Sequence, residues 1–499
     1  MADAPLMLGV SGLRGIVGES LTEEVAVSYA RAFGAWARER AGGGGATVVL
    51  GRDGRRGGDE LAGFAARGLT QAGCDVVDLG VAMTPTVGVL VDELKAQAGM
   101  VVTASHNPQE WNGLKALVPV DGTAQAPAAA DAEKLVARFR AGETPVAERT
   151  GSRRAMDGAA AVHAERVIVA LESLAGEAEV GEGVLAAADS VNSSGAEGAA
   201  MLLEELGIDE LLHLNRDGSG VFPHTPEPTE ANLSVEGGLL DAVRESGSRV
   251  GFAQDPDADR LALVDGAGRY IGEEYTLALC AESVLSALGD DAQGAVLVAN
   301  LSTSRMIDDV AKAHGARVVR SAVGEANVVE TMKRLASEGE RVVLGGEGNG
   351  GVIWPSVTYV RDSLGAMALV LSLMHRSGMA LAELVERVNA HAAGGAGYAI
   401  EKRKQPIASK EMANPACAAV RAWSTALSTP GSADETDGLR LDWSDLPSEA
   451  AGGTAGGAGW LHVRASNTEP IMRLIAEAPT RDQAGGILDA AAAAIEAAG

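Results

Sequence analysis

A strand–loop–helix–strand unit that occurs three times is the feature that most constrains how this chain can fold. The first copy has an apolar run at 47–50, a polar loop, a helical stretch at 59–72 and a second apolar run at 76–79. The other two copies have the same parts at 184–187, 189–195, 197–206 and 211–214, and at 295–298, 300–304, 305–314 and 318–319. Apolar runs that alternate with amphipathic helices predict an α/β layer architecture, and their lack of polar alternation favours strands covered on both faces.

The C-terminal part of the chain has a different pattern. Residues 439–443 and 460–463 alternate between apolar and polar side chains, as half-buried strands do. The Gly/Ala-rich stretch at 450–459 lies between them and predicts a long, mobile hairpin loop. A third strand near 471–476 and a helix at 481–497 complete an expected α+β unit.

Chain length and local changes in composition indicate several domains. A chain of 499 residues is too long for one hydrophobic core and corresponds to about three or four domains. An Ala/Pro-rich basic stretch, a turn after Val264 and a Gly/Ala-rich segment separate the repeated units and the C-terminal unit. We therefore expect α/β domains with mixed sheets at residues 1–154, 155–266 and 267–392, and a smaller α+β domain at 393–499.

Composition and charge limit the classes of partner. Hydrophobic residues make up 46% of the chain and charged residues 22%, which is typical of a soluble globular protein. The net charge of −27 argues against a nucleic-acid or anionic-membrane partner, because either would be repelled. No apolar run approaches the roughly 20 residues needed to span a bilayer, and the N-terminal residues do not resemble a signal peptide. We therefore expect a cytoplasmic monomer or homodimer that acts on small molecules.

The three cysteines, Cys74, Cys280 and Cys417, lie far apart in the sequence. Their spacing indicates neither a zinc site nor a disulfide framework. Since free cysteine is usually buried, we expect three buried free thiols.

Ser105 is a candidate nucleophile. It lies in the segment Thr103–Pro108, directly after an apolar run that ends at Val102. Pro108 prevents a helix from starting at once, so the segment predicts a hydroxyl presented on a loop at the tip of a strand.

Asp255, Asp257 and Asp259 form a candidate site for a hard cation. Carboxylates at alternate positions of an extended loop project to one side, and an all-oxygen set suits Mg²⁺. An EF-hand would need glycine at the position of Arg260, so that alternative fails. An aspartyl-phosphate phosphatase, with Asp255 as the nucleophile and Asp257 as the acid, is less favoured because Ala258 follows the second aspartate. A surface turn rich in aspartate stays as the structural alternative.

A candidate anion site lies near the C-terminus. Its donors are two guanidinium groups, hydroxyl and amide side chains and an exposed loop backbone, which suit the capture of a phosphate that does not react. The residues that supply them are Arg464, Ser466, Asn467, Thr468 and Arg473. A structural arginine-rich turn is the alternative.

Two glycine-rich segments add further candidate residues. Glu347 and Asn349 lie within 345–351, where they offer acceptors for sugar hydroxyls, although most loops of this kind are only turns. Arg14 lies between two glycines at 11–15, where the backbone can approach an anion closely.

With these motifs in place, the chain resembles the α-D-phosphohexomutase family over essentially its whole length. The resemblance implies three similar α/β domains and a smaller C-terminal domain around one central cleft. It also implies that Ser105 is the phosphoserine and a ligand of Mg²⁺ together with the three aspartates. Glu347 and Asn349 fall in the sugar loop of the family, and residues 464–473 in its phosphate loop. The positions that the family places around the reacting phosphoryl group are those of Arg14, His106, Lys115 and Arg260.

Within this family, segments 8–15, 254–260 and 346–351 are most similar to archaeal-type phosphoglucosamine mutases. The chain departs from the common pattern at Asn349, where serine is usual, and at Gly351, where histidine is usual. Both positions belong to the loop that selects the sugar.

The resemblance implies a Mg²⁺-dependent phosphosugar mutase that interconverts hexose 6-phosphate and hexose 1-phosphate through a hexose 1,6-bisphosphate. Glucosamine phosphate is the first expected substrate, and glucose or mannose phosphate the second. Lys115 is the expected proton-transfer group, which requires that cations nearby lower its pKa, and His106 is the alternative. A phosphatase and a non-catalytic sugar-phosphate binder are the rival classes.

Overall fold

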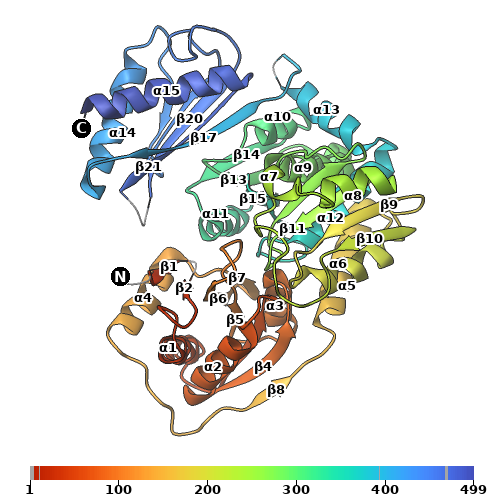
Figure 1. The fold of residues 1–499 in the computed structure, drawn as a ribbon, viewed down its shortest axis with the longest axis vertical. Coiled ribbons are helices and arrows are strands. Elements are labelled where there is room, and N and C mark those ends of the chain that lie inside the picture. Colours follow the sequence, from red (N-terminus) through yellow and green to blue (C-terminus); the bar gives the residue numbers. More distant parts are fainter. Residues whose placement is uncertain (1–4, 11, 393, 467–469, 499) are drawn as a thin grey trace.

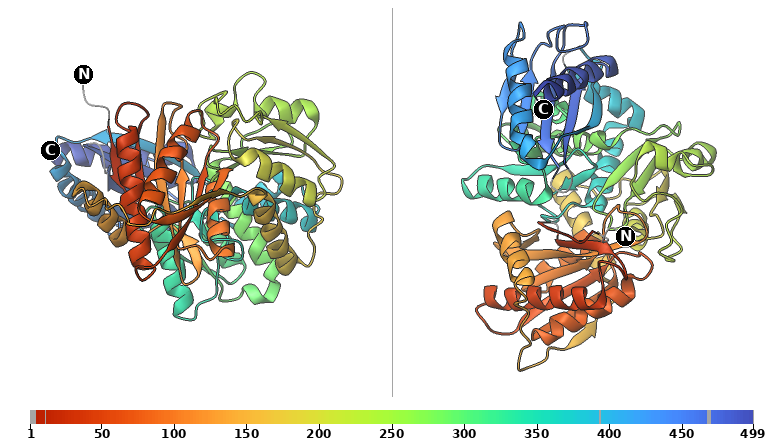
Figure 2. Two further views of the ribbon diagram at one scale, coloured as in Figure 1. Left: turned by 90° about the horizontal axis from the view of Figure 1, so that it is seen from below. Right: turned by 60° about the vertical axis from the view of Figure 1, so that its left-hand side comes forward.

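The computed structural model describes residues 5–10, 12–392, 394–466 and 470–498. Figure 1 shows four domains, numbered I to IV in chain order, with domain I at the bottom, domains II and III at the right and domain IV at the top left. A view from another side again shows domains I and IV at opposite ends, with elements of domain III between them (Figure 2). Three α/β domains and a C-terminal α+β domain confirm the predicted fold class.

Domain I is built on an eight-stranded mixed sheet in the order β1-β2-β6-β5-β3-β4-β8, with β7 paired to β6. Its strands are β1 (Met7–Gly9), β2 (Gly12–Ile16), β3 (Ala46–Arg52), β4 (Cys74–Val81), β5 (Ala98–Val102), β6 (Trp111–Val120), β7 (Thr123–Gln125) and β8 (Arg153–Ala155). Its helices are α1 (Glu23–Arg40), α2 (Gly58–Gln71), α3 (Thr84–Glu93) and α4 (Ala129–Arg140).

Strand β3 shows why the predicted apolar runs carry so few polar residues. Val48 and Leu50 pack into the core under α1 and α2, whereas Val49 packs into a separate core with α3. Both faces of the strand are therefore covered, and the successive positions Val48, Val49 and Leu50 are all apolar.

Domains II and III repeat one topology. Domain II contains α5 (Ala159–Ala175), β9 (Leu185–Asp189), α6 (Gly195–Glu205), β10 (Glu210–Leu214), α7 (Glu230–Leu233), α8 (Leu239–Ser246), β11 (Val250–Gln254) and β12 (Leu261–Asp265). Domain III contains α9 (Glu273–Leu288), η1 (Gly289–Ala292), β13 (Val296–Asn300), α10 (Met306–Ala313), β14 (Arg317–Ser321), α11 (Glu325–Ser337), β15 (Val342–Glu347), β16 (Gly351–Ile353), α12 (Ser363–Ser377) and α13 (Leu381–His391).

The threefold repeat predicted from the sequence is confirmed by the sheets. Their matching segments are β4-β3-β5-β6, β10-β9-β11-β12 and β14-β13-β15-β16. In each, the first three strands are parallel and the fourth is antiparallel to the third. The predicted helices of the three copies correspond to α2, α6 and α10.

Domains II and III share one hydrophobic core. It contains Leu202 of α6, Phe252 of β11, Leu297 of β13 and Leu369 of α12. Helix α12 packs against α5, α6 and α9 and is buried over most of its length. The predicted boundary at 266/267 therefore separates two sheets that share this core on one face, while each keeps a smaller core of its own on the other face. The exact domain boundaries stay predictions.

Domain IV is a five-stranded antiparallel sheet with helices on one face. Its elements are β17 (Ala399–Pro406), η2 (Lys410–Met412), α14 (Ala413–Thr425), β18 (Ser432–Asp434), β19 (Leu439–Trp443), β20 (Gly459–Ala465), β21 (Ile471–Ala478) and α15 (Arg481–Ala498). The sheet order is β17-β21-β20-β19-β18, so the predicted hairpin between β19 and β20 is confirmed.

The Gly/Ala-rich loop at 450–459 is held against domain IV, contrary to the expected free hairpin loop. Ala450 and Ala451 are buried, and Gln483 of α15 donates hydrogen bonds to the carbonyls of Thr454 and Gly456. The small side chains let the loop approach the helix closely.

The face of the domain IV sheet that lies opposite α14 and α15 docks on domain III. The carboxylate of Glu477 accepts hydrogen bonds from the Ser304 hydroxyl, the Arg305 backbone N–H at 3.0 Å and the Trp460 indole at 2.7 Å. His462 contacts Ser302 at 2.9 Å. Burial raises the pKa of Glu477, and the donated hydrogen bonds act against that rise.

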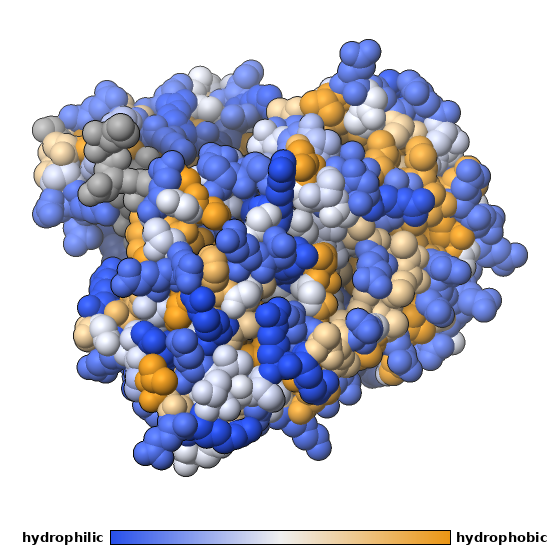
Figure 3. All heavy atoms as spheres, turned by 60° about the horizontal axis from the view of Figure 1, so that its bottom comes forward, coloured by the Kyte–Doolittle hydropathy of each residue, from blue (hydrophilic) through white to orange (hydrophobic). Residues whose placement is uncertain are grey.

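The surface hydropathy and the length of the helices test the expectation that the chain does not enter a membrane. Figure 3 shows a face on which hydrophilic side chains predominate and apolar ones form small groups. No single helix in the described part of the chain has the length and apolar character to cross a membrane; α12 and α13 meet that test only as a pair bent by 90°.

All three cysteines are free; Cys74 and Cys280 are buried, whereas Cys417 is only half-buried, so the expectation of three buried thiols is wrong for Cys417.

Replacing Glu477 tests the docking of domain IV. Glu477→Ala leaves two donors of domain III, the Ser304 hydroxyl and the Arg305 N–H, without their acceptor, which costs at least about 2 kcal/mol of docking free energy. We expect faster amide hydrogen exchange at residues 300–306 and along β21. Glu477→Gln is the matched control, because it keeps one acceptor oxygen and the side-chain volume. Equal exchange in the two variants would contradict this role.

Candidate active site

The predicted chemical motifs occupy the same place in the three repeated sheets. Ser105 lies between β5 and β6, the aspartates between β11 and β12, and Glu347 at the end of β15 before β16. In each domain this is the connection from the third strand to the antiparallel fourth strand. The repeat therefore gives each domain one functional loop at an equivalent position, and side-chain contacts bring the loops of domains I, II and III together.

Ser105 is held in an uncommon backbone conformation with its hydroxyl on the aspartate loop. Its φ is +50°, a left-handed value that a non-glycine residue adopts only when its surroundings hold it there. The Ser105 N–H donates to Thr103 Oγ1 at 2.8 Å. Ser105 Oγ donates to Asp255 Oδ2 at 2.9 Å and lies 3.3 Å from His106 Nδ1. The predicted nucleophile and the predicted metal loop are thus in direct contact.

Arg55 holds the serine loop in place, and the sequence analysis did not identify it. Its buried guanidinium donates to the carbonyls of Ser105, Asn107, Pro108 and Trp111. It also stacks 4.9 Å over the Phe222 ring of domain II. One side chain therefore fixes both the curvature of the loop and its position beside domain II.

The three aspartates are buried and offer ligand oxygens that lie within 4.8 Å of one another. Asp255 Oδ1 accepts the backbone N–H groups of Asp259 and Arg260, which folds the loop. Thr84 of domain I donates to Asp257 Oδ2 at 2.7 Å. Asp257 Oδ1 and Asp259 Oδ1 are buried and have no hydrogen-bond partner among the described residues. Buried, unpartnered carboxylate oxygens fit a hard divalent cation and do not fit a surface turn.

Lys115 and Arg361 supply positive charge to the aspartates from domains I and III. Lys115 Nζ lies 2.9 Å from Asp259 Oδ2 and 3.6 Å from Glu325 Oε2. Burial opposes the charge on Lys115, but the carboxylates of Asp259, Glu325 and Asp257 outweigh it and raise the pKa of the lysine. The expectation that neighbouring cations lower this pKa is therefore wrong, because carboxylates are the groups that face the amine.

Arg361 is a second residue that sequence reasoning missed. Its buried guanidinium pairs with Asp259 of the aspartate loop and, at 2.8 Å, with Glu347 of the predicted sugar loop. Glu347 also accepts the Asn300 amide at 2.8 Å and the Gly324 N–H at 3.1 Å. Its carboxylate is thus already oriented by three donors, whereas Asn349 is half-buried and accepts the N–H of Gly351 within the loop.

The other predicted residues of domains I and II gather around Ser105. Arg14 donates to Asn107 Oδ1 at 3.0 Å, on the serine loop. Arg260 lies 3.5 Å from Glu227, which also lies 3.7 Å from His106. Burial, with the nearby Arg260 and Arg14 charges, lowers the pKa of His106 to about 3, so its imidazole is neutral near pH 7.

The predicted anion site lies in domain IV. Arg464 and Arg473 are directly opposite each other on β20 and β21, so both side chains point to the sheet face that docks on domain III. Arg473 is exposed, and Arg464 lies 3.2 Å from Asp437. Ser466 is buried and its N–H donates to the Ile471 carbonyl. Asn467 and Thr468 lie outside the described residues.

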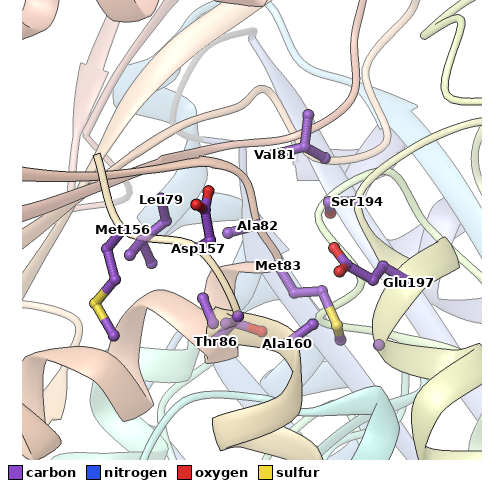
Figure 4. A pocket seen from close by; sticks show the side chains of 13 residues that line it. Leu79, Val81, Ala82, Met83, Thr86, Met156, Asp157, Ala160, Ser194 and Glu197 are labelled. Atoms are coloured by element: carbon purple, nitrogen blue, oxygen red, sulfur yellow. The ribbon is translucent and has the colours of Figure 1, made fainter.

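A cavity of about 150 Å³ lies between domains I and II, and none of the predicted site residues lines it. Figure 4 shows the side chains that line it, among them Met83, Thr86, Asp157 and Glu197. Its ionisable groups are carboxylates, so it does not suit an anionic ligand.

Comparisons with known proteins match the whole domain series. Families described as phosphoglucomutase/phosphomannomutase alpha/beta/alpha domains I, II and III match residues 5–143, 168–268 and 273–391, and the C-terminal domain of that series matches 416–494. The chain is 32% identical over 495 residues to a phosphoglucomutase/phosphomannomutase of Thermococcus kodakarensis, covering 97% of each chain. It is 33% identical over 486 residues to a probable phosphoglucosamine mutase of Methanopyrus kandleri, covering 96% of each.

A solved structure shows the same architecture. A phosphoglucomutase/phosphomannomutase family protein from Burkholderia thailandensis superposes with a TM-score of 0.76 at 27% identity. The alignment covers 99% of this chain and 98% of the other.

Replacing Asp257 tests the aspartates as a cation site. Asp257→Asn makes one buried ligand oxygen neutral and should weaken Mg²⁺ binding by at least about tenfold, since 1.4 kcal/mol corresponds to a factor of ten. Calorimetric titration with Mg²⁺ measures this directly. Asp217→Asn, an exposed change in domain II, is the control. An unchanged Mg²⁺ affinity in Asp257→Asn would make the aspartates a purely structural ion-pair cluster.

Proposed function

The chain belongs to the phosphoglucomutase/phosphomannomutase family, the α-D-phosphohexomutases, and we propose that it interconverts hexose 6-phosphates and hexose 1-phosphates through a phosphoserine at Ser105. The observation that carries the proposal is the hydrogen bond of 2.9 Å from Ser105 Oγ to the buried Asp255. It places the Ser105 hydroxyl directly against the candidate cation site. The loop that carries Ser105 is held in shape by Arg55. A serine that only filled space would not need this arrangement.

The proposed reaction transfers one phosphoryl group in each direction. A sugar hydroxyl attacks the phosphorus of phosphoserine 105; its new P–O bond forms as the bond to Ser105 Oγ breaks, and the hydroxyl proton passes to a base. The product is a hexose 1,6-bisphosphate. After this intermediate reverses its orientation, Ser105 Oγ attacks the other phosphorus as the bond from that phosphorus to the sugar oxygen breaks, and the sugar oxygen takes back the proton that the base accepted in the first step. The enzyme regains its phosphoserine, so no phosphate is consumed.

The residues fit a bound Mg²⁺ in this reaction. Ser105, Asp255, Asp257 and Asp259 would hold it, and the ion would offset the charge that develops at the serine oxygen. Two buried aspartate oxygens without a partner among the described residues support this assignment. Lys115 and Arg361 hold Asp259 from two sides, which keeps the loop in one geometry.

We propose His106 for proton transfer on geometry alone, since its lowered pKa of about 3 makes the neutral imidazole a weak base. Its Nδ1 lies 3.3 Å from Ser105 Oγ, within reach of groups at the serine. Lys115, the alternative, is engaged by Asp259 and Glu325, and its charge suits electrostatic stabilisation of the phosphoryl group. Arg14 and Arg260 add positive charge on the same side of the loop.

Arg464 and Arg473, with Ser466, Asn467 and Thr468, are proposed to hold the phosphate that is not reacting. A mutase needs such a site because the bisphosphate must stay bound while it turns over. The two arginines face the same side of the domain IV sheet, which supports bidentate capture. Glu347 and Asn349 would contact the sugar hydroxyls between the two phosphate sites.

Glucosamine 6-phosphate is the proposed substrate, with glucosamine 1-phosphate as product. Several relatives at about 30% identity are named probable phosphoglucosamine mutases, which supports this choice. A relative at 32% identity named phosphoglucomutase/phosphomannomutase supports glucose and mannose phosphates as the second choice. Measuring 1-phosphate formation from glucosamine, N-acetylglucosamine, glucose and mannose 6-phosphates discriminates among them.

A phosphatase that uses Asp255 as nucleophile is disfavoured. Asp255 is fully buried, one of its oxygens accepts two backbone N–H groups and the other accepts the Ser105 hydroxyl.

Ser105→Ala tests the phosphoserine. The variant lacks the oxygen that carries the phosphoryl group, so mutase activity should fall by several orders of magnitude while Mg²⁺ still binds the aspartates. A coupled assay of 1-phosphate formation and a Mg²⁺ titration measure the two effects. Turnover near the wild-type rate would show that transfer does not pass through Ser105.

Arg473→Ala tests retention of the bisphosphate. A charge-assisted hydrogen bond contributes about 1.5–3 kcal/mol, so substrate should bind roughly ten- to a hundredfold more weakly. The bisphosphate should also escape, which leaves Ser105 unphosphorylated, so activity should decay during turnover and return when hexose 1,6-bisphosphate is added.

Arg403→Ala is the matched control for that experiment. Arg403 lies on the adjacent strand β17, on the opposite face of the sheet, and pairs with Asp489 at 2.8 Å. Its loss should leave binding and progress curves unchanged. Normal binding without bisphosphate rescue in Arg473→Ala would show that this loop does not hold the distal phosphate.

A further inference from the structure

A cluster of two histidines and one glutamate lies in domain III, separate from Ser105 and the aspartates. Glu282 projects from α9, His314 follows α10 directly, and His391 is the last residue of α13. Their candidate ligand atoms lie within 4.8 Å of one another. The proposed mutase reaction uses none of them.

The distance of His391 from Glu282 matches that between two ligands of a tetrahedral metal ion, and His314 is hydrogen-bonded to the same carboxylate oxygen. His314 Nε2 lies 2.9 Å and His391 Nε2 3.3 Å from the same oxygen, Glu282 Oε2. In a tetrahedral zinc site with bonds of roughly 2.0 Å, ligand atoms lie about 3.3 Å apart. Imidazole nitrogens with one carboxylate form a donor set that suits zinc and neighbouring transition metals, whereas Mg²⁺ prefers oxygen alone.

The bonding around Glu282 supplies a second, independent observation. Its side chain is fully buried, yet Oε1 has no hydrogen-bond partner among the described residues, and neither has the buried His391 Nε2. Arg387 Nη2 lies 2.7 Å from Glu282 Oε1 but without the alignment of a hydrogen bond. Buried polar atoms without a hydrogen-bond partner lower the stability of the fold. A cation bound between Glu282 and His391 would provide a partner for both atoms.

We propose that Glu282, His314 and His391 bind a divalent transition-metal ion of the zinc type, with Arg387 as a competing cation. The Arg387 side chain is 36% exposed, so its guanidinium can turn to solvent when the ion binds. Binding needs both Nε2 atoms unprotonated, and water completes the coordination. No substrate group is involved.

The position of the site indicates a structural role. The ion would join the end of α10 and the end of α13 to the buried helix α9. Helix α13 leads into the connection to domain IV, and the residues before α10 receive Glu477 of domain IV. Metal binding would therefore fix the part of domain III to which domain IV is attached.

The test is zinc binding to chelator-treated, full-length protein in saturating Mg²⁺, which keeps the aspartates of the active site occupied. We expect about one zinc ion per chain, measured by metal analysis after gel filtration. Co²⁺ added in place of zinc should give the visible absorption of a tetrahedral site. Both signals should persist in Asp257→Asn, which separates this site from the aspartates.

Three variants assign the ligands and the competitor. His314→Gln and His391→Gln should lose the bound zinc; their side chains are 18% and 22% exposed, so the variants should fold, which their metal-free Tm checks. Arg387→Gln should bind zinc more tightly, because it removes the competing charge. The control is His375→Gln, a half-exposed histidine of domain III that lies 3.5 Å from Glu177.

The expected pattern is loss in the two ligand variants, gain in Arg387→Gln and no change in the control. An ion-pair network alone would not bind zinc more tightly when its arginine is removed. The proposal is overturned if wild-type protein retains no zinc under these conditions, or if either histidine variant binds it as tightly as His375→Gln. Unchanged or weaker zinc binding in Arg387→Gln would show that Arg387 does not compete with the metal ion for Glu282.

Discussion

The balance of buried charge around Asp259 is the interaction on which the rest of the site depends. Domain II supplies the carboxylate, domain I supplies Lys115 and domain III supplies Arg361. A buried carboxylate that loses its partner is destabilising by about 3–5 kcal/mol, so this cluster stabilises one relative placement of three domains. The same contacts fix the aspartate loop beside Ser105, and electrostatics thereby couples the assembly of the domains to the geometry of the reaction.

Much of the fold was predictable because burial leaves a direct record in the sequence. Strands covered on both faces, such as β3, must be apolar at successive positions, and three such units predict three α/β layers. Ser105 and the aspartates could be picked out as candidates, since each motif is local, and their contact is seen in the structure, whereas their roles stay predictions. Arg55 and Arg361 were not, because their partners lie far along the chain: the Ser105 carbonyl is 50 positions from Arg55, and Asp259 is 102 positions from Arg361.

The predictions for Lys115 and for the loop at 450–459 failed for the same physical reason. Both depend on contacts with residues that are distant in the sequence. The pKa of Lys115 is raised and not lowered, because the groups that face it across the domain boundary are carboxylates. The loop at 450–459 was expected to be free on its composition, yet Gln483 from α15 binds its carbonyls. Composition describes how a segment can behave in isolation, whereas the tertiary neighbours decide what it does in the folded chain.

The shared interior of domains II and III has a consequence for folding during synthesis. Helix α12 fills the core between the two sheets, and it is among the last elements of domain III to be made. Domain I can bury the core under α1 and α2 as soon as its chain leaves the ribosome, but domain II must wait, with apolar surface exposed, until residue 377 has emerged. The nascent chain of domain II is therefore the stretch on which chaperones would act for longest.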